Sequence, residues 1–156
     1  MINIDIPGSG LTEIELLVSD FSGTLSEDGV VLPGVKEKLN ELAEKLQIHV
    51  LTSDTFGKAR KELEGIKCTV HVLDGDDHTG RKERYVLSLG PQNVAALGNG
   101  NNDARMLKAA GIGIAVALKE GCSVEALLSA RILVLSPLDA IDLLLNPKRL
   151  MATLRR

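Results

Sequence analysis

Three short polar segments contain the side chains of this sequence that could carry out chemistry. They are residues 20–26, 52–54 and 98–103, and each follows a short apolar run, where a buried strand would end. In the first segment the carboxylate of Asp20 precedes a Gly-containing turn, which allows close backbone approach and leaves amide donors for an anion. A carboxylate in that setting could attack the phosphorus atom of a bound phosphate, although an Asp before a Gly can also be a simple turn residue.

The segment 98–103 reads Gly-Asn-Gly-Asn-Asn-Asp and precedes a helical pattern. Its amide and carboxylate side chains could cap that helix, or they could bind a hard cation through oxygen atoms. A Gly-x-Gly start is also found in dinucleotide-binding loops. Here, however, Asp103 stands in place of the third Gly and the loop lies far from the first strand–helix unit, so we do not interpret it as a dinucleotide site.

Alternating strand and helix patterns predict how these segments are positioned. Three isoleucines alternate with polar residues over 2–6 before a Pro-Gly turn, which predicts an N-terminal hairpin. Short apolar strands then follow near residues 14–18, 48–51, 69–73, 94–97, 112–116 and 132–135. Helical patterns lie between them, near 33–46, 56–63, 80–89, 102–110 and 123–128, and after 137.

This rhythm is typical of an α/β fold: a Rossmann-like, doubly wound, mainly parallel sheet with helices on both faces. A chain of 156 residues fits one domain, which we assign to residues 1–156. Ligands of such sheets bind at the carboxyl ends of the strands, so we expect the three polar segments to converge.

Composition argues against several functional classes. The net charge of -3 and a pI near 5.6 disfavour a nucleic-acid partner, and an aromatic content of 2% leaves few stacking platforms. We find no secretory signal and no apolar run that could span a membrane, so we expect a cytoplasmic protein without a membrane partner. Cys68 and Cys122 are expected to be free, buried thiols, and His49, His71 and His78 are interpreted as packing or surface residues.

The three polar segments resemble, in order, the first, second and fourth motifs of the haloacid dehalogenase-like superfamily. They read Asp-Phe-Ser-Gly-Thr-Leu (20–25), Leu-Thr-Ser-Asp (51–54) and Gly-Asn-Gly-Asn-Asn-Asp (98–103). The phosphorylation domain of P-type ATPases looks most similar, with Asp-Lys-Thr-Gly-Thr-Leu, Thr-Gly-Asp and Gly-Asp-Gly-x-Asn-Asp. The likeness covers nearly the whole chain after Leu11 and leaves no room for a substantial cap domain, so the sequence looks like a soluble, cap-less relative.

The resemblance implies a Mg²⁺-dependent phosphohydrolase, either a phosphatase or a slow ATPase, acting on a small phosphorylated substrate or a nucleotide. Asp20 would be the nucleophile and would form an aspartyl-phosphate. Thr52 and the backbone amide of Ser53 would hold the phosphoryl oxygens. The third motif of the family is a lysine that neutralises charge; Lys82 fits it best and Lys58 is the second choice.

The same resemblance implies a magnesium site beside the nucleophile. The cation would be held by the Asp20 carboxylate, the carbonyl of Ser22 and the fourth-motif loop, in which Asn99 supplies an oxygen atom and Asp103 supports either the metal or Lys82. Gly23 would lie in the phosphate-binding turn. Cap-less relatives often close the site with a neighbouring subunit, so a homo-oligomer is a further expectation.

Two residues depart from the family pattern. Ser22 stands where family phosphatases usually carry an Asp that acts as general acid and base, and loss of such a group lowers a rate by about 10² to 10⁴. Asn99 stands where a metal-binding Asp is common, so Mg²⁺ binding should be weaker. The alternative function is therefore a catalytically weak or silent phosphate- or nucleotide-binding regulatory protein of the same fold.

Overall fold

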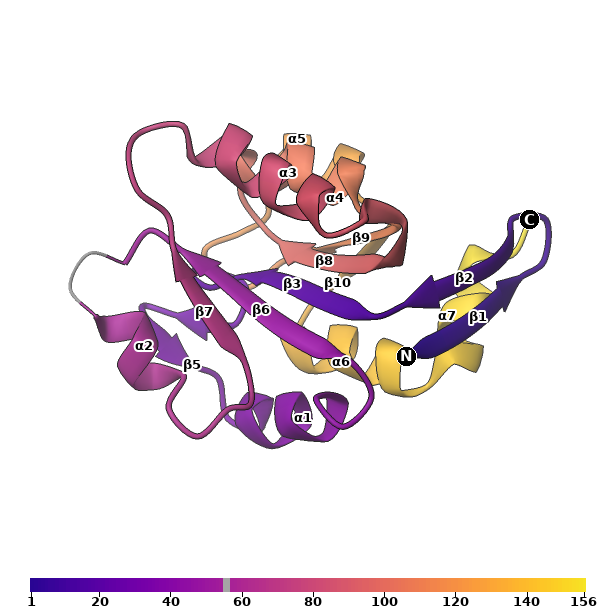
Figure 1. Cartoon of the computed structure of the whole chain (residues 1–156), viewed down its shortest axis with the longest axis horizontal. Helices are drawn as coiled ribbons and strands as arrows, with labels where there is room; N and C mark the ends of the chain where they lie inside the picture. Colours follow the sequence, from indigo (N-terminus) through magenta and orange to yellow (C-terminus); the bar gives the residue numbers. More distant parts are fainter. Residues whose placement is uncertain (55–56) are drawn as a thin grey trace.

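Six parallel strands form the central sheet of the protein (Figure 1), which is described here from a computed structural model over residues 1–54 and 57–156. Along the sheet the strands follow the order β10-β9-β8-β3-β6-β7. In chain order they are β3 (Leu16–Asp20), β6 (Gln47–Thr52), β7 (Thr69–Val72), β8 (Val94–Gly98), β9 (Ile112–Val116) and β10 (Ile132–Val134). Every residue of β3, β8 and β9 is buried, as expected for parallel strands covered on both faces. The predicted fold class is confirmed.

Helices cover both faces of this sheet (Figure 1). One face is covered by α3 (His78–Ser88), α4 (Ala104–Ala109) and α5 (Val124–Ser129). The opposite face is covered by α1 (Val35–Leu42) and α6 (Pro137–Leu145), and α2 (Lys58–Glu62) lies near α1. Two 3₁₀ turns, η1 (Pro91–Asn93) and η2 (Asn101–Asp103), precede β8 and α4. The apolar side chains between the layers are almost all aliphatic and form two separate core clusters, one on each face.

Two antiparallel hairpins complete the fold. The first pairs β1 (Ile2–Ile6) with β2 (Gly10–Ile14), extends from one end of the sheet and packs against α7 (Pro147–Leu154). The isoleucines of β1 are buried while the polar residues between them are exposed, which confirms the predicted hairpin. The second pairs β4 (Ser26–Glu27) with β5 (Val30–Val31) and follows the loop after β3.

Helix boundaries differ from the sequence predictions where the backbone adopts special conformations. The helix predicted near 33–46 begins only at Val35, because Gly34 before it has a left-handed φ of 87°, and it ends at Leu42. The helix predicted from 102 begins with the 3₁₀ turn η2 and continues as α4. The helix predicted over 56–63 includes residue 56, which lies outside the described residues; α2 itself covers Lys58–Glu62.

Two further findings concern the predictions from composition. Within the described parts of the chain, no helix is long and apolar enough to cross a membrane. Cys68 and Cys122 are free, as predicted, but both are half-buried. They are less buried than predicted, because Cys68 lies just before the edge strand β7 and Cys122 in the connection between β9 and α5, where cover is incomplete.

Candidate active site

The three polar segments meet at the carboxyl edge of the sheet, where they and the start of α3 enclose a small cavity. Strand register explains the convergence: Asp20 at the end of β3 lies beside Leu51 of β6, and Ser19 lies beside Leu97 of β8, so all three strands end at one edge. The cavity has a volume of about 100 Å³. Its lining residues are mostly polar: Asp20, Ser22, Thr52, Ser53, His78, Lys82, Asn99 and Asn102.

A buried lysine between two carboxylates forms the floor of the site. The Nζ atom of Lys82 lies 2.7 Å from Oδ1 of Asp20 and 2.7 Å from Oδ1 of Asp103, and donates a hydrogen bond to each. All three residues are buried, with exposed fractions of 7% for Asp20, 3% for Lys82 and 0% for Asp103. Lys82 projects from the second turn of α3, a helix capped by the carboxylate of Asp77, which accepts from the amide of Gly80.

The charge balance of this cluster perturbs the acid-base behaviour of its members. Burial and the neighbouring charge of Asp103 raise the pKa of Asp20 to about 6, although Lys82 and the Thr24 hydroxyl act in the opposite direction. For Lys82, burial favours the neutral amine, but the two carboxylates outweigh it and the pKa lies above its usual value. Lys82 therefore stays cationic in this cluster, and the ionised form of the neighbouring Asp20 carboxylate is less favourable than it would be in water.

Asp103 is occupied on both of its oxygens. Oδ1 accepts from Lys82, and Oδ2 accepts from the backbone amides of Asn99 and Gly100, each at 3.0 Å. The side chain is fully buried and does not line the cavity. This geometry favours a role in which Asp103 holds Lys82 and shapes the loop after β8, and it leaves Asp103 poorly placed to be the metal ligand that the sequence suggested.

Thr24 connects the nucleophile candidate to the loop after β8. Its buried hydroxyl lies 3.0 Å from Oδ2 of Asp20 and 3.2 Å from Oδ1 of Asn99. A hydroxyl has one proton, so it can satisfy only one of these two acceptors at a time. The amide of Asn99 is oriented by its other end, where Nδ2 donates to the carbonyl of Gly121 at 3.2 Å.

These two oxygens are suited to a divalent cation. At any time Thr24 donates to only one of the two, Oδ2 of Asp20 or Oδ1 of Asn99. Carboxylate and amide oxygens are ligands that suit Mg²⁺, which commonly binds through one or two carboxylates, water and phosphate. Ser22, whose carbonyl was the third predicted ligand, lines the same cavity. Among the described residues no group of three or more His, Cys, Asp or Glu side chains could enclose a metal.

Gly23 allows the turn after β3 to pass close to Asn99. Its φ is 75°, and a Cβ at this position would lie 2.5 Å from Nδ2 of Asn99, so only glycine fits without displacement. The backbone amide of Gly23 donates to the carbonyl of Ser26 at 3.0 Å. This amide is therefore hydrogen-bonded within the turn. Gly23 contributes to the site by allowing the turn to lie close to Asn99.

Thr52, Ser53 and Lys58 occupy the side of the site under the β4–β5 hairpin. Thr52 is buried and its hydroxyl accepts from the amide of Asp54 at 3.1 Å; among the described residues no acceptor takes the hydroxyl proton. Ser22, Thr52 and Ser53 also line an adjoining cavity of about 120 Å³. Lys58 lies in that second cavity and donates to the carbonyl of Asp28 at 3.3 Å. The structure thus brings Lys82, rather than Lys58, to Asp20.

Two residues that line the cavity, His78 and Asn102, and the buried Thr24 beside Asp20 had no assigned role in the sequence prediction. Thr24 and Asn102 stand inside the quoted motifs, so their position was available as a signal. His78 was interpreted as a surface or packing residue, yet it lines the cavity. Its signal was a spacing of four residues before Lys82, which places the two side chains on one helix face.

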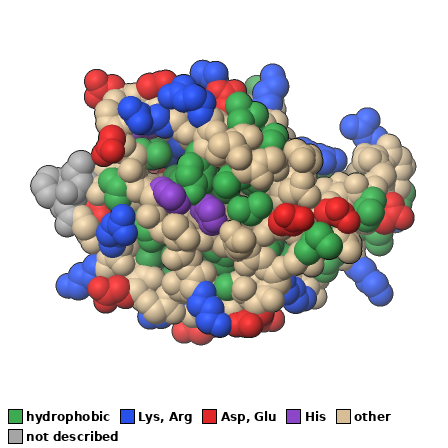
Figure 2. Space-filling model, viewed as in Figure 1, with side chains coloured by type: hydrophobic (Ala, Val, Ile, Leu, Met, Phe, Trp, Pro, Cys, Tyr) green, Lys and Arg blue, Asp and Glu red, His purple; other side chains and the backbone are tan. Residues whose placement is uncertain are grey.

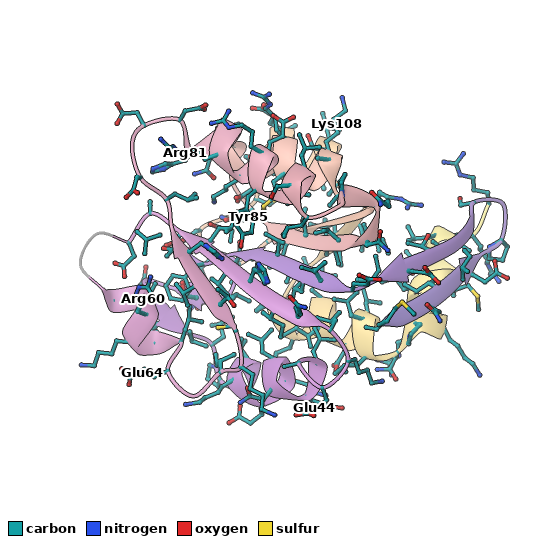
Figure 3. The ribbon with its side chains drawn as sticks, viewed as in Figure 1. Glu44, Arg60, Glu64, Arg81, Tyr85 and Lys108 are labelled. Carbon is teal, nitrogen blue, oxygen red and sulfur yellow. The ribbon has the colours of Figure 1, made fainter. Side chains whose placement is uncertain are left out.

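The other two histidines do pack, as predicted, on the open face of β6 and β7. Nδ1 of His49 lies 2.7 Å from the hydroxyl of Tyr85 on α3, and the rings of His49 and His71 are 5.7 Å apart. Figure 2 shows histidine side chains together on this face among hydrophobic ones, and Figure 3 shows Tyr85 between α3 and the sheet. Burial, followed by the charge of His71, lowers the pKa of His49, which favours its neutral form.

One family model and two curated proteins match parts of this chain. A family model described as haloacid dehalogenase-like hydrolase matches residues 84–120, which include the loop after β8. An uncharacterized protein of Methanocaldococcus jannaschii is 50% identical over 62 residues, which cover 40% of this chain and 67% of that protein. A second uncharacterized protein of the same organism is 40% identical over 40 residues, covering 26% of this chain and 91% of that protein.

Solved structures of similar fold include several phosphatases. A 3-deoxy-D-manno-octulosonate 8-phosphate phosphatase from Moraxella catarrhalis, in complex with magnesium ion, phosphate ion and KDO, aligns with a TM-score of 0.69 and 16% identity, over 90% of this chain and 92% of that one. A putative phosphatase of the same name from Vibrio cholerae aligns with a TM-score of 0.72 and 13% identity, over 96% and 97%. The cobalt-bound Haemophilus influenzae phosphatase aligns at 0.69 and 15%, over 88% and 90%. At these identities the likeness establishes the shared fold.

Proposed function

We propose that this chain, which belongs to the haloacid dehalogenase-like superfamily, is a Mg²⁺-dependent phosphohydrolase that acts through an aspartyl-phosphate on Asp20. One observation carries the proposal: a buried carboxylate at the end of β3 is held by a buried lysine and faces a small polar cavity. A purely structural ion pair would not need such a cavity. The phosphatase neighbours support the same reaction class.

In the first half of the reaction, a carboxylate oxygen of Asp20 attacks the phosphorus atom of a phosphate held in the cavity. The bond between phosphorus and the leaving oxygen breaks, and an aspartyl-phosphate forms. Lys82 donates a hydrogen bond to Oδ1 of Asp20, which keeps the carboxylate oriented, and its charge offsets the negative charge that collects as phosphate approaches. Asp103 keeps Lys82 in this position.

Thr52 and Ser53 would bind the phosphoryl oxygens; both line the cavity with Asp20 and Lys82, and the Thr52 hydroxyl donates to no acceptor among the described residues. Asp20 and Asn99, together with the carbonyl of Ser22, would hold Mg²⁺, which when bound neutralises phosphate charge. Water then attacks phosphorus, the bond to Asp20 breaks, and the free carboxylate and inorganic phosphate result.

The dimensions of the site favour a small phosphate ester or the terminal phosphate of a nucleotide. The cavity at Asp20 has about 100 Å³ and the adjoining cavity about 120 Å³, and the two share Ser22, Thr52 and Ser53. The phosphoryl group fits the first, and the organic part of the substrate would extend into the second, under the β4–β5 hairpin. Phosphorylated small molecules are therefore the substrate class.

A second function has specific support from Ser22 and Asn99. Among the residues that the structure describes, one carboxylate, that of Asp20, lines the cavity, because Asp103 is enclosed behind Lys82. A protein with this site could bind phosphate or a nucleotide as a regulatory domain and turn it over slowly or not at all. Binding of a beryllium or aluminium fluoride complex with Mg²⁺, in a protein without turnover, would favour this function.

The test is hydrolysis of p-nitrophenyl phosphate and ATP by the purified protein, with and without Mg²⁺, beside an Asp20→Asn variant. The proposal predicts release of phosphate that requires Mg²⁺ and is lost in the variant. A matched control is Asp5→Asn, since Asp5 is an exposed carboxylate on β1. Turnover that is the same in the Asp20→Asn variant would contradict the proposal.

A further inference from the structure

His78 lines the same small cavity as Asp20 and has a chemistry that the motif residues lack. It is the first residue of α3, is half-buried, and stands one helical turn before Lys82 on the same face. The helix start is fixed by the Asp77 cap and by the amide of His78, which donates to the carbonyl of Asp76 at 3.0 Å. The backbone of His78 is therefore fixed at the start of α3, and its side chain lines the cavity that Lys82 and Asp20 also line.

The proposed reaction needs a proton donor that the first motif does not provide. When phosphorus is transferred from an alkyl ester, the leaving oxygen departs as an alkoxide unless it is protonated in the transition state. Ser22 stands at the position of the family's acid-base group, and a serine hydroxyl is a poor proton donor. In the second half of the reaction, the attacking water must also lose a proton.

The other ionisable groups of the cavity are committed elsewhere. Asp20 is the nucleophile, Lys82 is held by two carboxylates, and Asp103 does not line the cavity. Among the described residues that line the cavity, His78 carries the one imidazole, a group that can donate a proton in one form and accept one in the other.

We propose that His78 is the general acid and base of this site, in place of the Asp that Ser22 replaces; the inference rests on the proposed phosphohydrolase function. It assigns a catalytic role to a residue outside the four family motifs, carried by the first turn of α3. The charged groups around this end of the helix are Asp76 and the cap residue Asp77, which pairs with Arg84. Facing it on the side of the cavity are Lys82 on α3, Asp20 from β3 and, behind the lysine, Asp103 from η2.

The proton balance closes over one turnover. As Asp20 attacks phosphorus and the ester P–O bond breaks, the imidazolium of His78 gives its proton to the leaving oxygen, so that an alcohol and an aspartyl-phosphate form. Neutral His78 then accepts a proton from the water that attacks phosphorus. The P–O bond to Asp20 breaks, inorganic phosphate is released, and the carboxylate and the imidazolium are both restored.

Leaving-group dependence tests this role. We would measure kcat/KM of the wild type and of His78→Asn and His78→Ala variants with p-nitrophenyl phosphate and with an alkyl phosphate such as glycerol 3-phosphate. Nitrophenolate leaves as an anion near neutral pH and needs little protonation, whereas an alkoxide needs a proton. The matched control is His71→Gln, which alters a half-buried histidine outside the cavity.

The proposal predicts a selective loss. For the alkyl phosphate, kcat/KM falls by about 10² to 10⁴ in both His78 variants, and for p-nitrophenyl phosphate by less than about tenfold. Added imidazole partly restores turnover of the alkyl ester by His78→Ala, a rescue that a structural role would not show. Equal losses on both substrates, or no loss, overturn the assignment while leaving the phosphohydrolase function intact. Absence of turnover by the wild type with either ester overturns the proposed function and this role with it.

Discussion

Replacing Asp20 by Asn should make the metal-free protein more stable while abolishing its activity. In the folded protein the carboxylates of Asp20 and Asp103 share one lysine, Lys82, and all three groups are buried. Burial and the charge of Asp103 raise the pKa of Asp20 from 3.8 to about 6, so the ionised carboxylate is less favourable here than in the unfolded chain. An amide of the same shape removes this charge and leaves Lys82 paired with Asp103.

The magnitude follows from the pKa. The rise in the pKa of Asp20 from 3.8 to about 6 lowers the free energy of unfolding by about 3 kcal/mol at neutral pH. Because the folded value lies above the unfolded one, protonation of Asp20 stabilises the fold; this stabilisation is complete below about pH 4 and is lost as pH rises through about 6. The free energy of unfolding of the Asp20→Asn variant should therefore exceed that of the wild type by about 3 kcal/mol at pH 7.5 and by roughly half of that at pH 5.

Urea unfolding in the presence of EDTA measures this difference. Wild type, Asp20→Asn and the exposed-site control Asp5→Asn would be compared at pH 7.5 and at pH 5. The control should follow the wild type at both pH values. A variant at Asp20 that unfolds at lower urea than the wild type at pH 7.5, or an advantage that does not shrink at pH 5, would refute the electrostatic account of the site.

Three further predictions follow from the same contacts. Lys82→Met leaves two buried carboxylates without a cation and should lower the free energy of unfolding, measured in urea, by about 3 to 5 kcal/mol. The control Lys108→Met, on the exposed face of α4, should have little effect. Adding Asp20→Asn to Lys82→Met should recover part of the lost stability. Asn99→Asp should raise Mg²⁺ affinity about tenfold or more, because a carboxylate about 4 Å from a cation contributes on the order of 1 to 4 kcal/mol. Calorimetric titration with Mg²⁺ checks this prediction, with Asn102→Asp as a control for charge alone. The kcat/KM of the wild type should rise with pH through about 6 as Asp20 ionises, and this limb should move to lower pH as Mg²⁺ is increased; a pH–rate profile that is flat between pH 5 and 7 would contradict it.

Much of the fold could be predicted from the sequence because its signals are local. Buried parallel strands appear as short apolar runs, and helices appear as apolar residues at helical spacing, so β3, β6 and β8 were placed to within a few residues. Motif spacing placed Asp20 and the loop after β8 at strand ends, which parallel pairing brings to one edge. Helix limits were less accurate because they depend on single residues such as Gly34 in a left-handed conformation.

The details of the site depended on packing that the sequence does not reveal. Asp103 was expected to support either the metal or Lys82, and the packing of α3 against η2 decides for Lys82, because both carboxylate oxygens of Asp103 are used by Lys82 and the loop amides. His78 was interpreted as a packing or surface residue; its spacing from Lys82 indicated a shared helix face, but only the fold shows that this face is directed at the cavity of Asp20. Both arrangements join segments more than twenty residues apart in the sequence.

The most direct test of the central claim is detection of a phosphoryl group on Asp20 itself. The protein would be mixed with substrate and Mg²⁺, quenched in acid within the first turnovers, digested, and examined by mass spectrometry, with borohydride reduction to mark an acyl phosphate. We predict one phosphoryl adduct, on the peptide that contains Asp20, which is absent from the Asp20→Asn variant. Turnover with the phosphoryl group on another residue, or turnover with no covalent adduct and an active Asn variant, would contradict the account.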